Sequence, residues 1–180
     1  MQKNRSSIIL GIDPGIADTG YGIISKDKEG NLVCLSYGII KTSAKMEMTR
    51  RLELINQGLD KIIKEHKPKL MAVEQLFFCR NVKTALAVGQ ARGVVLLTAK
   101  QNKVPIVEFT PLQVKQAVAA YGQASKMQVQ KMVKLLLKMD ELPKPDDAAD
   151  ALAIAICATN SNNSNLRIYS NASNTNSLNI

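Results

Sequence analysis

The segment 146–158, DDAADALAIAICA, strongly limits the folds that this chain can adopt. Eight apolar residues follow Asp150 without interruption, which predicts a helix that is buried against the rest of the protein. Three carboxylates, those of Asp146, Asp147 and Asp150, crowd the first turn of the same helix. Because burying an unpaired carboxylate is costly, the fold must supply partners for this end of the helix.

The length of 180 residues predicts one domain with a substantial core. No apolar stretch approaches the roughly 18–20 residues that span a bilayer. The first residues, MQKNRSS, lack the apolar region of a signal peptide. The three cysteines, Cys34, Cys79 and Cys157, are scattered and never in C-x-x-C spacing, which argues against structural zinc. We therefore expect a cytoplasmic protein in a reducing compartment.

The net charge is +9, with 24 Lys and Arg against 15 Asp and Glu. This excess favours a polyanionic partner such as nucleic acid or an anionic membrane, although charge alone fits a merely basic protein equally well. The single histidine, His66, lies beside Lys64 and Lys67 at the end of an amphipathic segment, where we expect it to be solvated. Ser-His-Asp and Cys-His mechanisms therefore have almost no basis, and carboxylates, lysines or a metal ion must carry any chemistry.

The hydrophobic pattern predicts a mixed α/β sheet with an antiparallel part. Thr110 with Gln113, and Ser125 with Gln128, form two capping boxes that start helices. Beyond Ala158 the chain is rich in Asn and Ser, which predicts a folded domain over 1–158 and a disordered tail over 159–180. The predicted strands are 7–13, 19–25, 32–40, 70–74 and 106–109, and the predicted helices are 45–66, 82–101, one from Thr110, one from Ser125 to about Met139, and 146–157.

Acidic residues follow two of the predicted strands. Asp13 in GIDPG and Glu74 in LMAVE are each ordinary at a strand end when taken alone. If their strands are parallel neighbours, both carboxylates lie at the edge where open α/β sheets bind ligands. Asp150 shares a helical face with Asp147 at i,i+3 and with Asp146 at i,i+4, so periodicity cannot choose between the two. Capping and the helix dipole account for Asp146 but not for Asp150.

Clustered carboxylates without histidine are hard oxygen ligands, which suit Mg²⁺ or Mn²⁺. Two such ions about 3.5–4 Å apart can activate a water and stabilise both oxygens of a phosphoryl displacement. A phosphodiester nuclease reconciles an acidic pocket with a basic surface, because ions neutralise the pocket while Lys and Arg hold the nucleic-acid backbone.

Lysines near the predicted site are candidates for phosphate binding. Lys131, Lys134 and Lys138 fall at i, i+3 and i+7 on one helical face, for which a solvated surface is the alternative interpretation. Lys115 and Lys126 lie at or near helix starts, where free backbone N–H groups also attract phosphate.

Two features around residues 77–93 each have two interpretations. Phe77 and Phe78 are either core residues or a wedge that unstacks bases. Ala85, Gly89 and Gly93 recur at four-residue intervals, which fits either close packing of their helix on the sheet or a dimer interface.

Four motifs, ILGIDPGIADTGYGII, VEQLFF…N…A…GQARGV, QVKQAV and DAADALAIA, resemble those of the RuvC Holliday junction resolvases of bacteria, in order and spacing from about Ile8 to Ala158. The resemblance implies a ribonuclease-H-like fold with a mixed five-stranded sheet flanked by helices. It also implies a homodimer that cuts four-way DNA junctions with two Mg²⁺ ions per subunit, for which Mn²⁺ can substitute. The subunits would nick strands of like polarity symmetrically, in recombination and repair, with the RuvA and RuvB branch-migration proteins as partners.

Aligned on these motifs, the family's catalytic and metal-binding carboxylates fall on Asp13, Glu74, Asp147 and Asp150, so the resemblance selects Asp147 over Asp146. Some relatives have histidine at the position of Asp147 and lysine at that of Arg80. The family's lysines align with Lys115 and Lys126, and its loop aromatic aligns with Phe77. Together with Arg80, Asn81, Lys131 and Lys134, these are the predicted DNA-binding residues. The family dimerises through the helix at 82–101, where Ala85, Gly89 and Gly93 are the predicted dimer contacts.

Two other function classes remain as alternatives. A DNA-binding or scaffolding protein with an inactive site is disfavoured because all four carboxylates are present. A nucleotide-dependent phosphotransferase is disfavoured because such proteins generally need a second, similar domain, for which this chain has no room.

Overall fold

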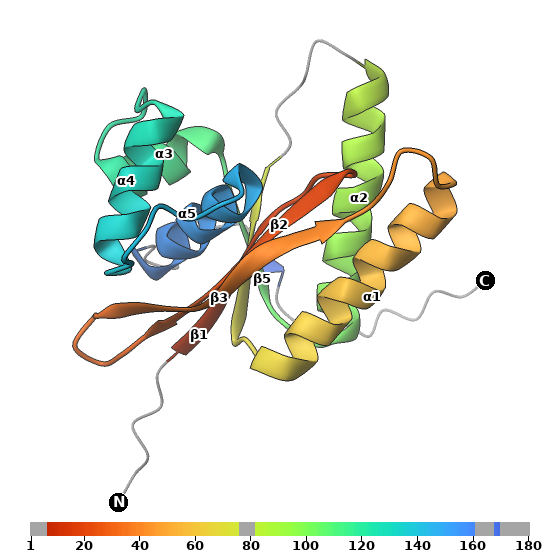
Figure 1. Cartoon of the computed structure of the whole chain (residues 1–180). Coiled ribbons are helices and arrows are strands. Elements are labelled where there is room, and N and C mark those ends of the chain that lie inside the picture. The colour runs from red at the N-terminus through yellow and green to blue at the C-terminus, as the bar shows by residue number, and fades with distance from the viewer. Residues whose placement is uncertain (1–6, 76–81, 161–167, 170–180) are drawn as a thin grey trace, which may run out of the picture.

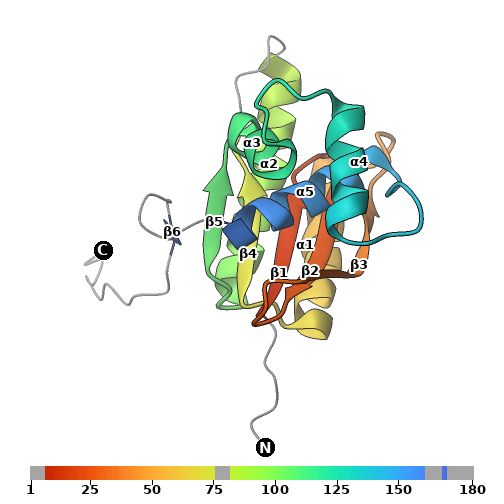
Figure 2. The same cartoon turned by 90° about the vertical axis from the view of Figure 1, so that its left-hand side faces the viewer.

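The computed structural model describes residues 7–75, 82–160 and 168–169 (Figure 1). A single sheet separates two layers of helices, with α1 and α2 on one face and α3, α4 and α5 on the other (Figures 1 and 2). The strands are β1 (Ser7–Asp13), β2 (Asp18–Lys26), β3 (Leu32–Lys41), β4 (Leu70–Glu74), β5 (Ile106–Phe109) and β6 (Ile168–Tyr169). The helices are α1 (Met48–His66), α2 (Val82–Gln101), α3 (Pro111–Ala119), α4 (Lys126–Leu136) and α5 (Asp146–Asn160).

The strand order is β3-β2-β1-β4-β5-β6. β1, β2 and β3 form an antiparallel meander, whereas β4 is parallel to both β1 and β5. Ile12 on β1 lies opposite Val73 on β4, so the residues that follow them, Asp13 and Glu74, reach the same edge of the sheet. The strands that carry the two carboxylates are therefore parallel neighbours, which is the arrangement that bringing the carboxylates together requires.

The five predicted strands are all present, and the two capping boxes open α3 and α4 as expected. α1 begins at Met48 rather than at Lys45. Within the segment 159–180, Ile168–Tyr169 pair antiparallel with Ile106–Val107 and so add a short sixth strand. The rest of the tail beyond Asn160 lies outside the described residues, and its disorder stays a prediction.

α4 ends at Leu136, before the predicted end near Met139. Lys138 adopts a left-handed backbone conformation with φ of 52°. Its N–H donates to the carbonyl of Leu135 at 3.2 Å, and the N–H of Met139 donates to the carbonyl of Lys134 at 2.9 Å. These bonds form a Schellman motif, which usually carries glycine at the left-handed position. Lys138 therefore leaves the helical face that it was predicted to share with the other lysines of α4.

α5 is buried along almost its whole length and packs against β1 and β2. Glycines form the contact surface of both strands. A Cβ atom at Gly20 would overlap the carbonyl oxygen of Asp147, and one at Gly11 would overlap the carbonyl oxygen of Ala151. At Gly22 it would lie 2.8 Å from a backbone nitrogen of α5. The absence of side chains at these positions lets the helix backbone lie directly on the strands.

Side chains from three elements hold the turn between β1 and β2. The Thr19 hydroxyl donates to the carbonyl of Gly15 at 2.6 Å. The hydroxyl of Thr42, the residue directly after β3, donates to the carbonyl of Ile16. Arg51 on α1 donates to the same carbonyl at 3.1 Å and to the Thr42 hydroxyl at 2.9 Å. This network fixes the turn that leaves the sheet directly after Asp13.

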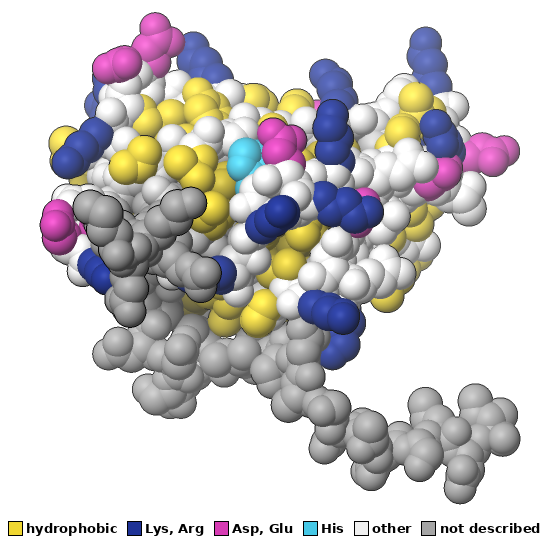
Figure 3. Space-filling model, turned by 90° about the horizontal axis from the view of Figure 1, so that it is seen from below, with side chains coloured by type: hydrophobic (Ala, Val, Ile, Leu, Met, Phe, Trp, Pro, Cys, Tyr) yellow, Lys and Arg dark blue, Asp and Glu magenta, His cyan; other side chains and the backbone are white. Residues whose placement is uncertain are grey.

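The end of the sheet where β1 and β4 begin carries dispersed charge. Figure 3 shows Lys and Arg side chains spread over this face between acidic and apolar ones. His66 ends α1 close to the start of β4, so it lies at the opposite end of that strand from Glu74. Its side chain is only 20% exposed, less than expected, and its Nε2 is 3.8 Å from Glu65. Within the described parts of the chain, no helix combines the length and apolarity needed to cross a membrane.

Gly20→Ala should lower the free energy of unfolding by about 3 kcal/mol, because the new methyl group forces α5 away from β2. The measurement is urea unfolding followed by circular dichroism. Gly93→Ala is the matched control, since a Cβ at that helical position meets nothing within 4 Å and alanine favours helix. Equal stability of the Gly20→Ala protein and the parent would contradict this account of the packing.

Candidate active site

Three elements bring four of the predicted carboxylates to one edge of the sheet. Asp13 ends β1 and pairs with Gly20 on β2, whose Cα lies against the backbone of Asp147 on α5. Glu74 ends the parallel strand β4, and Asp150 follows one turn further along α5. The first strand, the fourth strand and the last helix thus meet as the sequence predicted, whereas the roles of these residues stay predictions.

Burial, and then the charges of neighbouring carboxylates, raise the pKa of Asp13, Glu74 and Asp150. Burial raises the pKa of Asp13 to about 7, with further contributions from the negative charges of Glu74, Asp150 and Asp147, and the nearby Lys126 only partly offsets them. Burial, followed by the charge of Asp150, also raises the pKa of Glu74, although Lys115 and Lys126 oppose this. The site therefore holds more negative charge than its own lysines neutralise.

Lys126, the first residue of α4, is in direct contact with this cluster. Its Nζ lies 3.0 Å from Asp150 and 3.4 Å from Asp146. Burial alone would lower the pKa of Lys126, but the hydrogen bond to Asp150 and the charges of both aspartates together raise it. Burial raises the pKa of Asp150 in spite of the Lys126 contact.

Asp146 does not cap α5, contrary to the expectation from sequence. It is already the first residue of the helix, and the carbonyl of Pro145 accepts the first helical hydrogen bonds, from Ala148 and Ala149. The Asp146 carboxylate instead accepts a hydrogen bond from Gln130 on α4 at 2.9 Å. This bond, and then the charge of Lys126, lower the pKa of Asp146. Asp146 thus joins α4 to α5 beside the cluster.

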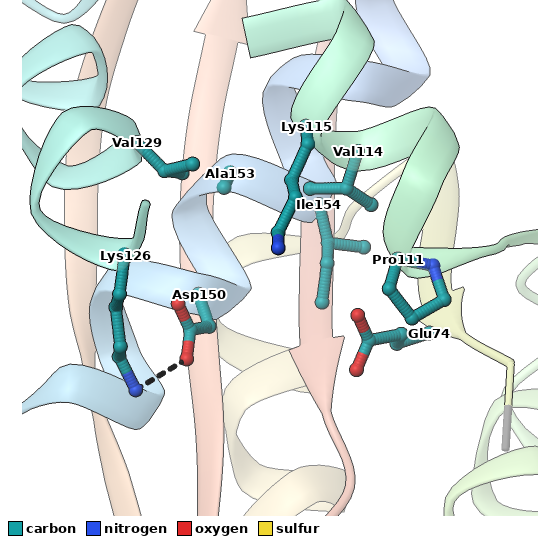
Figure 4. Close-up of a pocket in the computed structure, with 9 residues that line it drawn as sticks. All are labelled: Glu74, Pro111, Val114, Lys115, Lys126, Val129, Asp150, Ala153 and Ile154. Atoms are coloured by element: carbon teal, nitrogen blue, oxygen red, sulfur yellow. Dashed lines mark ion pairs between the residues drawn. The ribbon is translucent and has the colours of Figure 1, made fainter. Parts of the chain in front are cut away.

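A cavity of about 230 Å³ opens next to these residues (Figure 4). Glu74 and Asp150 lie on opposite sides of it, and Lys115 points into the space between them (Figure 4). The back of the cavity is apolar. The lining residues are Glu74, Pro111, Val114, Lys115, Lys126, Val129, Asp150, Ala153 and Ile154.

The chemistry of the donor set fits a hard divalent cation, since it consists of carboxylates alone. Burial, and then the negative charges of the neighbouring carboxylates, raise the pKa of Asp13, and a bound cation would favour its charged form. Among the residues that the structure describes, however, no three His, Cys, Asp or Glu side chains close around one point. The carboxylates therefore line a common edge, and Lys126 forms an ion pair with one of them, Asp150.

Of the other predicted DNA contacts, the structure describes three lysines. Lys115 lies in the first turns of α3 and reaches the cavity, while Lys131 is exposed and Lys134 half-buried on α4. Neither Lys131 nor Lys134 lines the cavity. Phe77, Arg80 and Asn81 lie outside the described residues.

α2 presents an exposed stripe away from the core. Leu86 is 65% exposed, Leu97 is 54% exposed, and a Cβ at Gly93 would meet open space. These positions are spaced at i, i+7 and i+11, so they share one helical face. Gly93 therefore does not serve close packing on the sheet, while Ala85 and Gly89 beside it are half-buried. The dimer interpretation of this ridge stays a prediction.

Sequence reasoning did not anticipate the contributions of the glycines and of Gln130. Gly20 and Gly22 occupy alternate positions of a predicted strand, a spacing that could have indicated close approach of another backbone. Gln130 is buried and polar, but nothing in its sequence context shows that it binds a carboxylate sixteen residues later.

Comparison with known proteins gives consistent matches over most of the chain. The family model "Crossover junction endodeoxyribonuclease RuvC" matches residues 9–158. The RuvC protein of Natranaerobius thermophilus is 56% identical over 150 residues, which are 83% of this chain and 92% of that protein.

Solved structures agree with this match. Thermus thermophilus RuvC is 37% identical with a TM-score of 0.79, and its complex with Holliday junction substrate is 35% identical with a TM-score of 0.78. Each comparison covers 84% of this chain and 93% of the other chain. The predicted ribonuclease-H-like fold is thereby confirmed.

Asp13→Asn should stabilise the protein in the absence of divalent ions at pH 8. The pKa of Asp13 rises from 3.8 to about 7 on folding, so its stabilising contribution is complete below pH 3.8 and is lost as the pH rises through about 7. Removing the charge should add about 2 kcal/mol to the free energy of unfolding at pH 8 and nothing at pH 3.5. Urea unfolding at both pH values measures this, with exposed Asp140→Asn as the control. Equal gains at both pH values would contradict the electrostatic cause.

Proposed function

Because the chain belongs to the RuvC family of crossover junction endodeoxyribonucleases, we propose that it is a metal-dependent endonuclease that resolves four-way DNA junctions. The observation that carries the proposal is the meeting of Asp13, Glu74 and Asp150 at one edge, beside a cavity that two lysines enter. The carboxylates would hold cations, and the lysines would hold the phosphate on which the enzyme acts.

Asp13, Glu74, Asp147 and Asp150 are the proposed ligands for two Mg²⁺ ions per subunit, with Mn²⁺ as a substitute. When bound, such ions supply Lewis-acid stabilisation of phosphate oxygens and a water of lowered pKa. The protein contributes a rigid frame for the ligands, because Asp13 and Glu74 end paired strands and α5 is fixed by backbone contact with glycines.

Two of the proposed DNA contacts line this cavity. Lys115 and Lys126 supply positive charge at its wall, and Lys131 and Lys134 would follow the DNA backbone along α4. Phe77, Arg80 and Asn81 follow Glu74 closely in sequence, so we place them among the DNA contacts on family membership. A net charge of +9 supports the same partner.

The size of the cavity disfavours a nucleotide-dependent phosphotransferase. Pockets that bury whole small molecules usually measure about 300–1,000 Å³. The cavity beside Glu74 and Asp150 is smaller, at about 230 Å³, which suits one phosphodiester group better than a complete nucleotide.

A homodimer through the exposed stripe of α2 would present two sites, as paired symmetric nicks in strands of like polarity require. The apolar exposure of Leu86 and Leu97 supports this surface. Action in recombination and repair, a cytoplasmic location and cooperation with RuvA and RuvB branch-migration proteins belong to the same proposal and follow from family membership.

The decisive assay compares a synthetic four-way junction with linear duplex of the same sequence, with and without Mg²⁺. Asp13→Asn should reduce junction cleavage by roughly 10³-fold, which corresponds to about 4 kcal/mol of transition-state stabilisation. Junction affinity, measured by gel shift, should stay equal or rise, because the variant removes a negative charge that faces phosphates. Cleavage by this variant at the parental rate would refute the site. Parental protein that binds junctions but never nicks them in Mg²⁺ or Mn²⁺ would favour the scaffolding alternative.

Leu97→Glu should convert the dimer into monomers at micromolar concentration, since it replaces an exposed apolar side chain of the stripe with a charge. Analytical ultracentrifugation measures the change. Leu135→Glu is the matched control, because Leu135 is 68% exposed on α4 and lies on a different helix. An unchanged sedimentation coefficient for Leu97→Glu would place the interface elsewhere.

A further inference from the structure

Lys126 contacts two carboxylates that differ in their proposed roles. Its Nζ lies 3.0 Å from Asp150, a proposed ion ligand, and 3.4 Å from Asp146, which is not part of that ligand set. The ammonium group thus contacts the Asp150 Oδ2 atom that is also available to a divalent cation. A bound ion and Lys126 would therefore compete for this oxygen.

Asp146 is held in place independently of Lys126. Its Oδ1 accepts a hydrogen bond of 2.9 Å from the amide of Gln130, while its Oδ2 is the atom nearest Lys126. Gln130 is only 7% exposed, and it lies at i+4 from Lys126 on the same helix. A buried amide therefore fixes one oxygen of Asp146 and leaves the other directed at the lysine.

The geometry points to Asp146 as the partner that retains Lys126 at the site when a divalent ion takes Asp150, with Gln130 holding Asp146 in position. This inference rests on the proposed function, because it assumes that Asp150 binds an ion. Without Asp146, Lys126 would either stay on Asp150 and block the ion, or leave the cavity. With it, the lysine moves a short way along a shared pair of carboxylates and stays close to an incoming phosphate.

Asp146 and Gln130 are thus positioning residues, which act on the reaction through Lys126. They should influence ion binding before any DNA is present. A purely structural link between α4 and α5 would affect thermal stability instead, and would leave the affinity for ions unchanged.

The test measures Mn²⁺ binding to the DNA-free full-length protein by electron paramagnetic resonance of the free ion. Asp146→Asn keeps an oxygen that can accept from Gln130 but removes the charge that attracts Lys126. Because Lys126 then remains on Asp150, Mn²⁺ affinity should fall about three- to fivefold. Glu141→Gln, which removes one exposed negative charge from the loop before α5, should leave the affinity within about twofold of the parent.

A double-mutant cycle separates this mechanism from long-range electrostatics. In a Lys126→Met background, Asp146→Asn should no longer lower Mn²⁺ affinity. Gln130→Leu, which changes no charge, should reproduce part of the loss only when Lys126 is present. Thermal unfolding midpoints of all variants show whether each one is folded.

Two outcomes would overturn the inference. If Asp146→Asn weakens Mn²⁺ binding equally with and without Lys126, the aspartate acts through its charge and not through the lysine. If the folded Asp146→Asn protein binds Mn²⁺ as tightly as the parent does, Asp146 does not retain Lys126 at the site. Failure of the proposed function looks different, because the parental protein itself would then neither bind Mn²⁺ nor cleave junctions.

Discussion

The contact between the backbone of α5 and the glycines of β1 and β2 is the constraint on which the site depends. Backbone packed directly on backbone leaves no side chain that could adjust its rotamer. Gly20 pairs with Asp13 in the sheet and abuts Asp147 on the helix, so the backbones that carry these two carboxylates are fixed relative to each other. After burial and the charges of Glu74 and Asp150, the charge of Asp147 contributes to the raised pKa of Asp13.

The second helical layer compensates for part of this cluster of charge. α3 and α4 each begin at a capping box, which fixes the first turns that carry Lys115 and Lys126. Both lysines enter the cavity from that layer, whereas the carboxylates come from the sheet and from α5 (Figure 4). The site is therefore an interface between an acidic half and a basic half, an arrangement that suits metal ions and a phosphate together.

Much of the fold could be predicted because its signals are local. The boxes at Thr110 and Ser125 involve residues three positions apart, and they open helices where expected. The end of α4 could not be predicted in the same way, since Lys138 occupies a left-handed position that usually requires glycine. The surrounding structure outweighs the cost of that conformation, and sequence periodicity carries no record of it.

The sequence by itself determined that acidic residues follow two buried strands and begin one apolar helix. Periodicity left Asp146 and Asp147 equivalent beside Asp150, and only the motif resemblance favoured Asp147. Tertiary structure separates them, because packing on the glycines fixes the rotation of α5 about its axis. With this packing, the charge of Asp147 acts on Asp13, whereas Asp146 contacts Gln130 and Lys126 on α4. Neighbouring residues on a helix point about 100° apart, so only the packed surface could decide which of the two joins the cluster.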